Sequence, residues 1–181
     1  MRIEKEKSIA VVIDLQEKLI PHIYNKDIII KNNTKLLEGL NILNIPIFLT
    51  QQYTKGLGKT IIEISKFIKN EDDIVEKLAF SCCKEDKFLD KILPLNPKFA
   101  IISGIESHVC ILQTAIDLLQ YNITPVIVTN CISSRYEYDH QIAIMRLNNE
   151  GAILTTYESL LFELLTYSGT DIFKQISKIV K

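Results

Sequence analysis

The chain has 181 residues, 47% of them hydrophobic, and a formal net charge of −1 at pH 7. This length and composition are enough for a full core, so we expect one domain spanning residues 1–181. Acidic and basic residues alternate along the chain, which argues against nucleic acid and membrane surfaces as partners and favours a small-molecule substrate.

The first apolar stretch, Ser8–Ile13, is interrupted by Asp14 and is far shorter than the roughly 20 residues of a membrane span. No secretory leader is recognised, so the four cysteines are expected to be free thiols of a cytoplasmic protein. There is no Cys-x-x-Cys pair, and the chain has only three histidines, so a Cys/His zinc site is not expected.

The first half of the chain begins as a β-α-β unit. Residues 7–14 form a β-branched apolar run without alternation, which is typical of a parallel strand covered on both faces. Apolar residues at helical spacing follow, and Pro46 opens the next strand. The expected elements are a strand at 7–14, a helix at 27–43, a strand at 47–50, a loop at Gly56 and Gly58, a helix at 60–68 and a short strand at 75–80.

The second half continues the alternation. Pro94 ends one helix, an apolar strand runs into Gly104, and Gly151 suits the position just after a helix. The expected elements are a helix at 85–93, a strand at 97–103, a helix that follows it to about residue 120, a strand at 126–129, a helix at 139–149, a strand at 152–155 and closing helices at 158–166 and 170–180.

Strands that alternate with helices predict an α/β fold with three α-β-α layers and a doubly wound, six-stranded parallel sheet. We expect the Rossmann-like order 3-2-1-4-5-6, in which ligands bind beyond the carboxyl ends of strands one and four. Asp14 ends the first of these strands, and Cys110 follows the other.

Cys110 is a candidate nucleophile. Free backbone N–H groups and the partial positive charge at a helix start stabilise a thiolate, so we expect a lowered thiol pKa there. The same N–H groups could donate hydrogen bonds to the oxygen of a substrate carbonyl as it becomes tetrahedral. The alternative is an inert, buried cysteine.

Asp14 is the candidate base, because a carboxylate at the mouth of a covered strand is costly to desolvate without a partner or a task. A fixed cation would balance the charge of such a site, and Lys77 is the candidate. The alternatives are a turn-forming aspartate and a solvated lysine at a strand edge.

Several competing motifs are absent. The chain has neither a dinucleotide-binding G-x-G-x-x-G nor a phosphate-binding G-x-x-x-x-G-K-[ST]. Ser107 does not lie in G-x-S-x-G, and Gln16 stands where a two-aspartate magnesium site needs its second ligand. His108 lies two residues from Cys110, too near to face it, so a local Cys-His dyad is not expected.

Six blocks of the sequence resemble the isochorismatase-like cysteine hydrolases, and within them the isochorismatase domain-containing proteins. The blocks are distributed over nearly the whole chain: VVIDLQEKL at 11–19, TQQYTKGLG at 50–58, EKLAFSC at 76–82, SGIESHVCILQTAIDLL at 103–119, ISSR at 132–135 and EGAILTTYESLLFELL at 150–165.

The resemblance implies a triad of Cys110 as nucleophile, Asp14 as general base and acid, and Lys77 as the orienting cation. In such enzymes the cysteine attacks a carbonyl carbon, often of an amide, and water hydrolyses the resulting thioester. The family pattern implies an oxyanion hole at the backbone N–H groups of Glu106 and Cys110. It also places a cis peptide bond at Ile105–Glu106.

The resemblance has two limits. Nicotinamidases hold a metal after the second strand with an aspartate and histidines, whereas this chain has Gln51, Gln52 and Tyr53 there. We therefore expect no metal, no cofactor and no nicotinamidase activity. Isochorismate hydrolases do not use a cysteine nucleophile, so that reaction is also not expected. By analogy with closer relatives, the substrate-binding residues are Gln51, Tyr53, Phe80, Glu106 and His108, unless they serve only packing or face solvent.

The resulting hypothesis is a cytoplasmic homo-oligomer that hydrolyses a small amide-like substrate. The apolar C-terminal helices, with Leu160 to Leu165, suit either a subunit interface or the chain's own core. Two alternatives stay open. One is a catalytically silent interaction module, and the other is a redox sensor in which Cys110 is oxidised with help from Cys82, Cys83 or Cys131.

Overall fold

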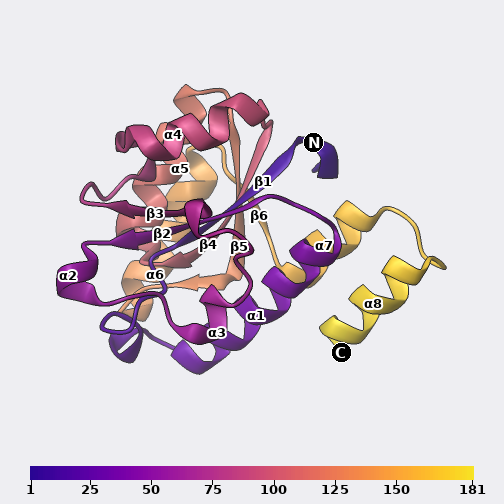
Figure 1. Ribbon diagram of the computed structural model, residues 1–181, viewed down its shortest axis with the longest axis horizontal. Coiled ribbons are helices and arrows are strands. Elements are labelled where there is room, and N and C mark those ends of the chain that lie inside the picture. The colour runs from indigo at the N-terminus through magenta and orange to yellow at the C-terminus, as the bar shows by residue number, and fades with distance from the viewer.

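The computed structural model describes residues 1–181, and its six strands form one sheet in the order β3-β2-β1-β4-β5-β6. Every neighbouring pair is parallel, so the predicted doubly wound sheet is confirmed (Figure 1). The strands are β1 (Ser8–Ile13), β2 (Ile47–Gln52), β3 (Ile74–Lys77), β4 (Phe99–Ile105), β5 (Thr124–Ser133) and β6 (Ile153–Thr155).

Helices cover both faces of the sheet, as Figure 1 shows. Leu37 of α1 and Leu161 of α7 pack in one core cluster, and Phe88 of α4 and Leu118 of α5 pack in the other. The helices are α1 (Lys26–Ile42), α2 (Thr54–Leu57), α3 (Ile62–Ser65), α4 (Asp86–Ile92), α5 (Leu112–Gln120), α6 (Glu137–Asn149), α7 (Tyr157–Leu165) and α8 (Asp171–Val180).

The central strands β1 and β4 are buried along their whole length. Their side chains alternate between the two core clusters, so Val11 packs on one face and Val12 on the other. Burial on both faces explains why these strands have continuous apolar sequences. Their carboxyl ends lie side by side, since Ile13 pairs with Gly104.

Some expected boundaries differ from the structure. The helix expected at 60–68 is reduced to the single turn α3, because Thr60 forms a β-bridge with Gln16 and Ile61 is extended. The loop expected at Gly56 contains the short helix α2. Strand β5 is longer than expected, and its register against β4 shifts between Ile102 and Gly104.

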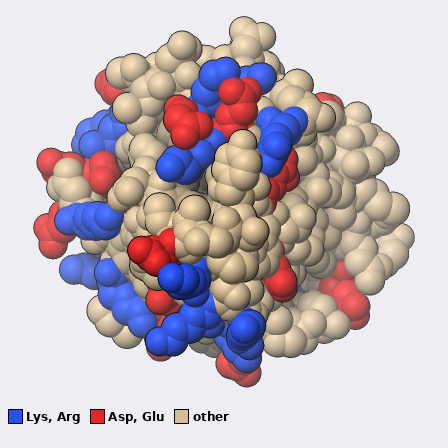
Figure 2. Space-filling model, turned by 90° about the vertical axis from the view of Figure 1, so that its right-hand side faces the viewer, with Lys and Arg blue, Asp and Glu red and all other residues tan.

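The C-terminal leucines belong to the chain's own core. Leu160, Leu161 and Leu164 are buried there, so they do not form an exposed apolar face for another subunit. On the face seen in Figure 2, basic and acidic side chains are interspersed among uncharged ones. No helix combines the length and the apolar character needed to cross a membrane.

Candidate active site

Three strand ends position Asp14, Lys77 and Cys110. Asp14 directly follows β1 and has a left-handed backbone, with φ of 52°. Lys77 is the last residue of β3, and Cys110 lies in a π-helical turn, Ser107–Ile111, between β4 and α5. The peptide bond Ile105–Glu106 before this turn is cis, as the family pattern predicts.

The structure brings the three side chains together. Lys77 Nζ lies 2.7 Å from Asp14 Oδ2, and both side chains are almost completely buried, at 0% and 1% exposure. Lys77 Nζ also donates to Cys110 Sγ at 3.5 Å. Thr50 Oγ1 donates to Asp14 Oδ1 at 2.7 Å, so the second carboxylate oxygen has a partner too. Charge pairing and hydrogen bonds together offset the cost of burying the two ions.

Gln52, which no sequence motif singles out, is part of the same cluster. Its Oε1 accepts from Lys77 Nζ at 2.6 Å and lies 4.0 Å from Cys110 Sγ. Gln52 pairs with Lys77 in the β2–β3 register, which brings both residues to the same place in the sheet. The β2–β3 register is the signal that identifies Gln52, rather than its neighbour Gln51, as the residue beside Lys77, since successive strand residues face opposite sides.

Burial and charge set the protonation of the cluster. Burial lowers the pKa of Lys77, but the charge of Asp14, the largest opposing cause, helps to raise its pKa above the ordinary value, so Lys77 is an ammonium ion. Burial raises the pKa of the Cys110 thiol well above its ordinary value, and Asp14 raises it further. Lys77 opposes this only in part. The expected lowered thiol pKa is therefore wrong, because the side chain is desolvated, with the residue only 7% exposed.

The other cysteines are also buried, and all four are free thiols. Burial raises the pKa of Cys82 to about 11 and that of Cys83 to about 12. The charges of Asp14 and Lys77 act on Cys82, so this thiol lies near the cluster. Thr114 Oγ1 accepts from its backbone N–H at 3.0 Å.

Three consecutive residues before Cys110 bind the segment that follows β5. Glu106 Oε1 accepts from the backbone N and from Nε of Arg135, both at 3.0 Å. The next two contacts are Ser107 Oγ with His140 Nδ1 and His108 Nδ1 with Ser134 Oγ, each at 2.9 Å. These contacts, which the sequence did not predict, hold the turn that carries Cys110. The Glu106 N–H makes no hydrogen bond within the protein, so it is free to donate to a ligand.

A cavity of about 480 Å³ lies beside this turn. It is lined by Leu19, His22, Glu106, Arg135 and Tyr136, which follow β1, β4 and β5. The cavity lies beyond the carboxyl ends of the central strands, where doubly wound sheets bind ligands, but Asp14, Lys77 and Cys110 do not line it.

The remaining predicted substrate-binding residues lie in different surroundings. Gln51 is buried, whereas Tyr53 and Phe80 are 47% and 54% exposed. The Phe80 carbonyl oxygen accepts from Lys77 Nζ at 3.1 Å, so its backbone rather than its ring contacts the triad. The His108 imidazole is engaged with Ser134.

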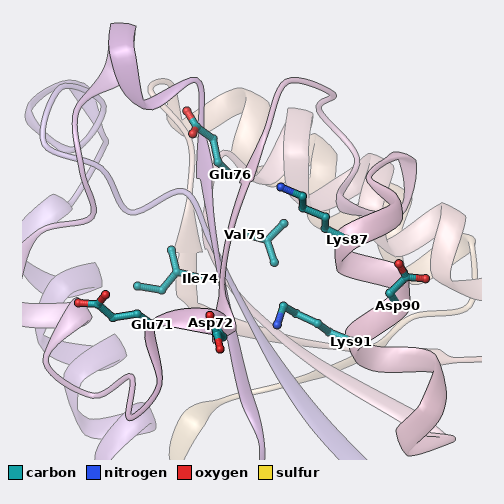
Figure 3. A pocket seen from close by; sticks show the side chains of 8 residues that line it. All are labelled: Glu71, Asp72, Ile74, Val75, Glu76, Lys87, Asp90 and Lys91. Atoms are coloured by element: carbon teal, nitrogen blue, oxygen red, sulfur yellow. The ribbon is translucent and has the colours of Figure 1, made fainter.

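Another hollow, of about 510 Å³, lies at the outer strand β3 and helix α4 (Figure 3). None of the triad residues lines it. Its lining is mostly charged and consists of Glu71, Asp72, Ile74, Val75, Glu76, Lys87, Asp90 and Lys91. Glu76 is already bonded to the backbone N–H and the hydroxyl of Thr54. No three His, Cys, Asp or Glu side chains are grouped so that they could hold a metal ion.

The fold and the site together define a class of protein: doubly wound α/β proteins with a buried Asp-Lys-Cys cluster at the strand ends. The isochorismatase domain model matches residues 8–159, so the chain belongs to the isochorismatase family and has its hydrolase fold. The resemblance seen in the sequence is thereby confirmed.

Curated relatives match over almost the whole chain. Isochorismatase domain-containing protein 2A of Mus musculus is 37% identical over 182 residues, covering 99% of this chain and 85% of the relative. The secreted isochorismatase effector Isc1 of Phytophthora sojae is 32% identical over 184 residues, covering 99% and 87%. Because one relative is described as secreted, the cytoplasmic location expected from the sequence stays a prediction.

Solved structures match equally widely. The MAR1 ribonuclease of Caenorhabditis elegans superposes with a TM-score of 0.92 at 34% identity, covering 99% of this chain and 92% of that one. The expected exclusion of nucleic acid is therefore not supported. The YcaC gene product of Escherichia coli, described as an octameric hydrolase of unknown specificity, has a TM-score of 0.90 at 19% identity, covering 99% and 90%. At that identity it shows the shared fold alone.

Proposed function

We propose that the protein is a cysteine hydrolase that cleaves a small amide-like or related carbonyl substrate through a covalent acyl-thioenzyme. One observation carries this proposal: a single ammonium group, Lys77 Nζ, lies 2.7 Å from the Asp14 carboxylate and 3.5 Å from the Cys110 sulfur. A base and a nucleophile that both contact one cation supply the parts that covalent catalysis requires.

In the first step, Asp14 takes the thiol proton as the Cys110 sulfur forms a bond to the carbonyl carbon. The raised thiol pKa means that the sulfur stays protonated until a base removes the proton. The nucleophilic sulfur therefore forms by proton removal during the attack, and no thiolate is needed in the resting enzyme. Lys77 stabilises the negative charge as it moves from Asp14 to the sulfur.

The carbonyl electron pair moves onto oxygen, where an oxyanion develops. In the proposal, the backbone N–H groups of Glu106 and Cys110 donate to this oxygen. The free N–H of Glu106 supports this role, because it has no partner to give up. The contacts of Glu106, Ser107 and His108 with the segment after β5 hold the turn in place.

In the second step, the carbon–nitrogen bond breaks, and Asp14 returns its proton to the leaving nitrogen. Ammonia or an amine departs and leaves a thioester on Cys110. Asp14 then takes a proton from water, whose oxygen attacks the thioester carbon. The carbon–sulfur bond breaks, the sulfur regains the proton from Asp14, and a carboxylic acid is released.

The test is a panel of small primary amides incubated with the wild type, with Cys110→Ala and with Cys131→Ala. Cys131 is a matched control, because it is also a buried free thiol but lies on β5 in the opposite core cluster. We expect ammonia release by the wild type and Cys131→Ala, and a loss of at least about 1,000-fold in Cys110→Ala. Equal release by all three proteins would contradict the mechanism.

The same samples separate the other candidates. The relative named MAR1 ribonuclease favours RNA as a second candidate substrate. Cleavage of single-stranded RNA that persists in Cys110→Ala would point to that activity at a different site. Peroxide-driven joining of Cys110 to another cysteine, faster than any hydrolysis, would favour a redox sensor. No turnover and no preferential reaction of Cys110 would favour a silent interaction module.

We also propose that the protein assembles into a homo-oligomer. YcaC, described as octameric, supports this by analogy, and the leucines of α7 take no part in the expected interface because they are buried within the chain. Sedimentation as a monomer at micromolar concentration would contradict it.

A further inference from the structure

We propose that Gln52 is a positioning residue that holds the Lys77 ammonium beside Cys110 while Asp14 carries the proton. The inference rests on the proposed function, which requires Asp14 to become neutral during each cycle. It assigns Gln52 the task of keeping the cation in place during that interval.

Lys77 Nζ has more acceptors around it than it has protons. An ammonium group donates three hydrogen bonds and accepts none. Five acceptors surround it: Asp14 Oδ2 at 2.7 Å, Gln52 Oε1 at 2.6 Å, the Phe80 and Ala79 carbonyl oxygens at 3.1 and 3.3 Å, and Cys110 Sγ at 3.5 Å. The two short contacts are with Asp14 and Gln52, so these hold the ammonium most firmly. Of these two, only the Gln52 contact is also a hydrogen bond, because Asp14 Oδ2 is an ion-pair partner that receives no hydrogen bond.

The orientation of the Gln52 amide is determined by its other end. Gln52 Nε2 donates to the Leu78 carbonyl oxygen at 2.7 Å, and a carbonyl oxygen can only accept. The NH₂ group must therefore face Leu78, which leaves Oε1 facing Lys77. Both contacts of the amide fit the same orientation.

The backbone of Gln52 is also tied to the strand end that carries Asp14. The buried amide of Gln16 accepts from Gln52 N at 2.7 Å and donates to Gln52 O at 2.9 Å. Gln16 lies two residues after Asp14, so the segment that carries the base also holds the backbone of Gln52. The place of Gln52 beside Lys77 is thus supported from the backbone and from the side chain.

The two short contacts differ in how they respond to the reaction. When Asp14 takes the thiol proton it becomes neutral, and the charge attraction of its ion pair with Lys77 is lost. The Gln52 amide does not titrate, so its bond to Lys77 does not change. Gln52 therefore keeps the ammonium near the sulfur at the stage when the sulfur is negative or bonded to the substrate. The titratable groups that act on Lys77, which this amide contacts, are Asp14, Cys110 and Cys82.

A first experiment imitates the neutral state of the base. Asp14→Asn has the shape of a protonated aspartate, and ¹⁵N-lysine NMR detects slowly exchanging ammonium protons of a held lysine. The Lys77 signal is assigned by its absence in Lys77→Arg. We expect the signal to persist in Asp14→Asn and its protons to exchange at least about tenfold faster in Asp14→Asn/Gln52→Met. Loss of the signal in Asp14→Asn alone, or equal exchange in both proteins, would overturn the proposal.

A second experiment adds charge without changing shape. Gln52→Glu places a carboxylate near the sulfur, whereas Gln120→Glu adds the same charge at the exposed far end of α5. We expect iodoacetamide to alkylate Cys110 about tenfold more slowly in Gln52→Glu at about pH 8, and at the wild-type rate in Gln120→Glu. Wild-type rates in a folded Gln52→Glu would contradict the proposed contact.

Neither experiment uses a substrate, so the two proposals can fail separately. If no amide is hydrolysed but the NMR and alkylation results are as expected, the proposed function fails and the role of Gln52 in placing Lys77 stands. If Cys110-dependent hydrolysis is found and both results are negative, only the role of Gln52 fails.

Discussion

Gly104 lies so close to the backbone of Ile13 that a Cβ atom on Gly104 would stand 2.1 Å from the Ile13 carbonyl oxygen. Its φ of 116° is also a conformation that side chains disfavour. The absence of a side chain lets β4 approach β1 at the strand ends that carry Asp14 and the turn with Cys110.

Gly104→Ala is therefore expected to destabilise the fold by more than about 2 kcal/mol, because backbone strain and a backbone clash combine. Gly151→Ala is the control, since Gly151 also has positive φ but has no atom within 4 Å of the added Cβ. Chemical denaturation measures both. Equal losses in the two variants would show that strain alone accounts for the effect.

Lys77→Met is expected to cost about 3 to 5 kcal/mol of unfolding free energy, because it leaves the Asp14 carboxylate buried without its counter-ion. The double variant Lys77→Met/Asp14→Leu should recover much of that loss, since it removes both charges. Urea denaturation measures the stabilities. A double variant as unstable as the single one would mean that packing, rather than the unpaired charge, determines the loss.

Stability is expected to fall above about pH 9. The pKa of Cys82 is 9.0 ordinarily and about 11 in the folded protein, so the folded chain keeps a proton that the unfolded chain loses. This contribution is complete below pH 9.0 and is lost as the pH rises through about 11, and the total loss above both pKa values is about 3 kcal/mol. The raised pKa of Lys77 acts in the same direction, between its ordinary value of 10.5 and its higher value in the folded protein.

Unfolding free energies measured between about pH 8 and pH 11 should thus decline less steeply in Cys82→Ala than in the wild type. Ile111→Val is the control, because it alters a buried side chain of the same core cluster without removing a titratable group. Parallel declines in the wild type and Cys82→Ala would contradict the assignment to this thiol.

Ser107→Ala is expected to lower kcat for the amide identified by the panel about tenfold with little change in KM, since it frees the turn that carries Cys110 from His140. Gln141→Ala, at the exposed neighbour of His140, should leave both constants unchanged. Steady-state kinetics measures this. A rise in KM with kcat unchanged would assign Ser107 to substrate binding instead.

Burial lowers the pKa of His140, with Glu137 opposing it, so His140 stays neutral where the unfolded chain already binds a proton. This costs stability as the pH falls below the ordinary value of 6.5. Thermal unfolding of His140→Gln should therefore change less between about pH 7 and pH 5 than that of the wild type. If His140→Gln and the wild type lose stability equally between about pH 7 and pH 5, groups other than His140 determine the loss.

The sequence by itself determined the order of strands and helices, because continuous apolar runs and helical periodicities are properties of neighbouring residues. It also placed Asp14 and Cys110 at adjacent strand ends, since a doubly wound sheet with right-handed crossovers has few possible orders. Local patterns were less reliable where a long-range contact competes with them, as at Thr60, which pairs with Gln16 instead of starting a helix.

Only the tertiary structure decided the chemistry of the site. Whether Gln51 or Gln52 faces Lys77 depends on the register of two strands, and a shift of one residue would exchange them. The protonation of Cys110 depends on desolvation by residues from several elements, which outweighs the nearby cation. The contacts of Ser107 and His108 join segments about 30 residues apart in the chain. Distances and burial of this kind arise from packing between distant segments, so no local pattern in the sequence records them.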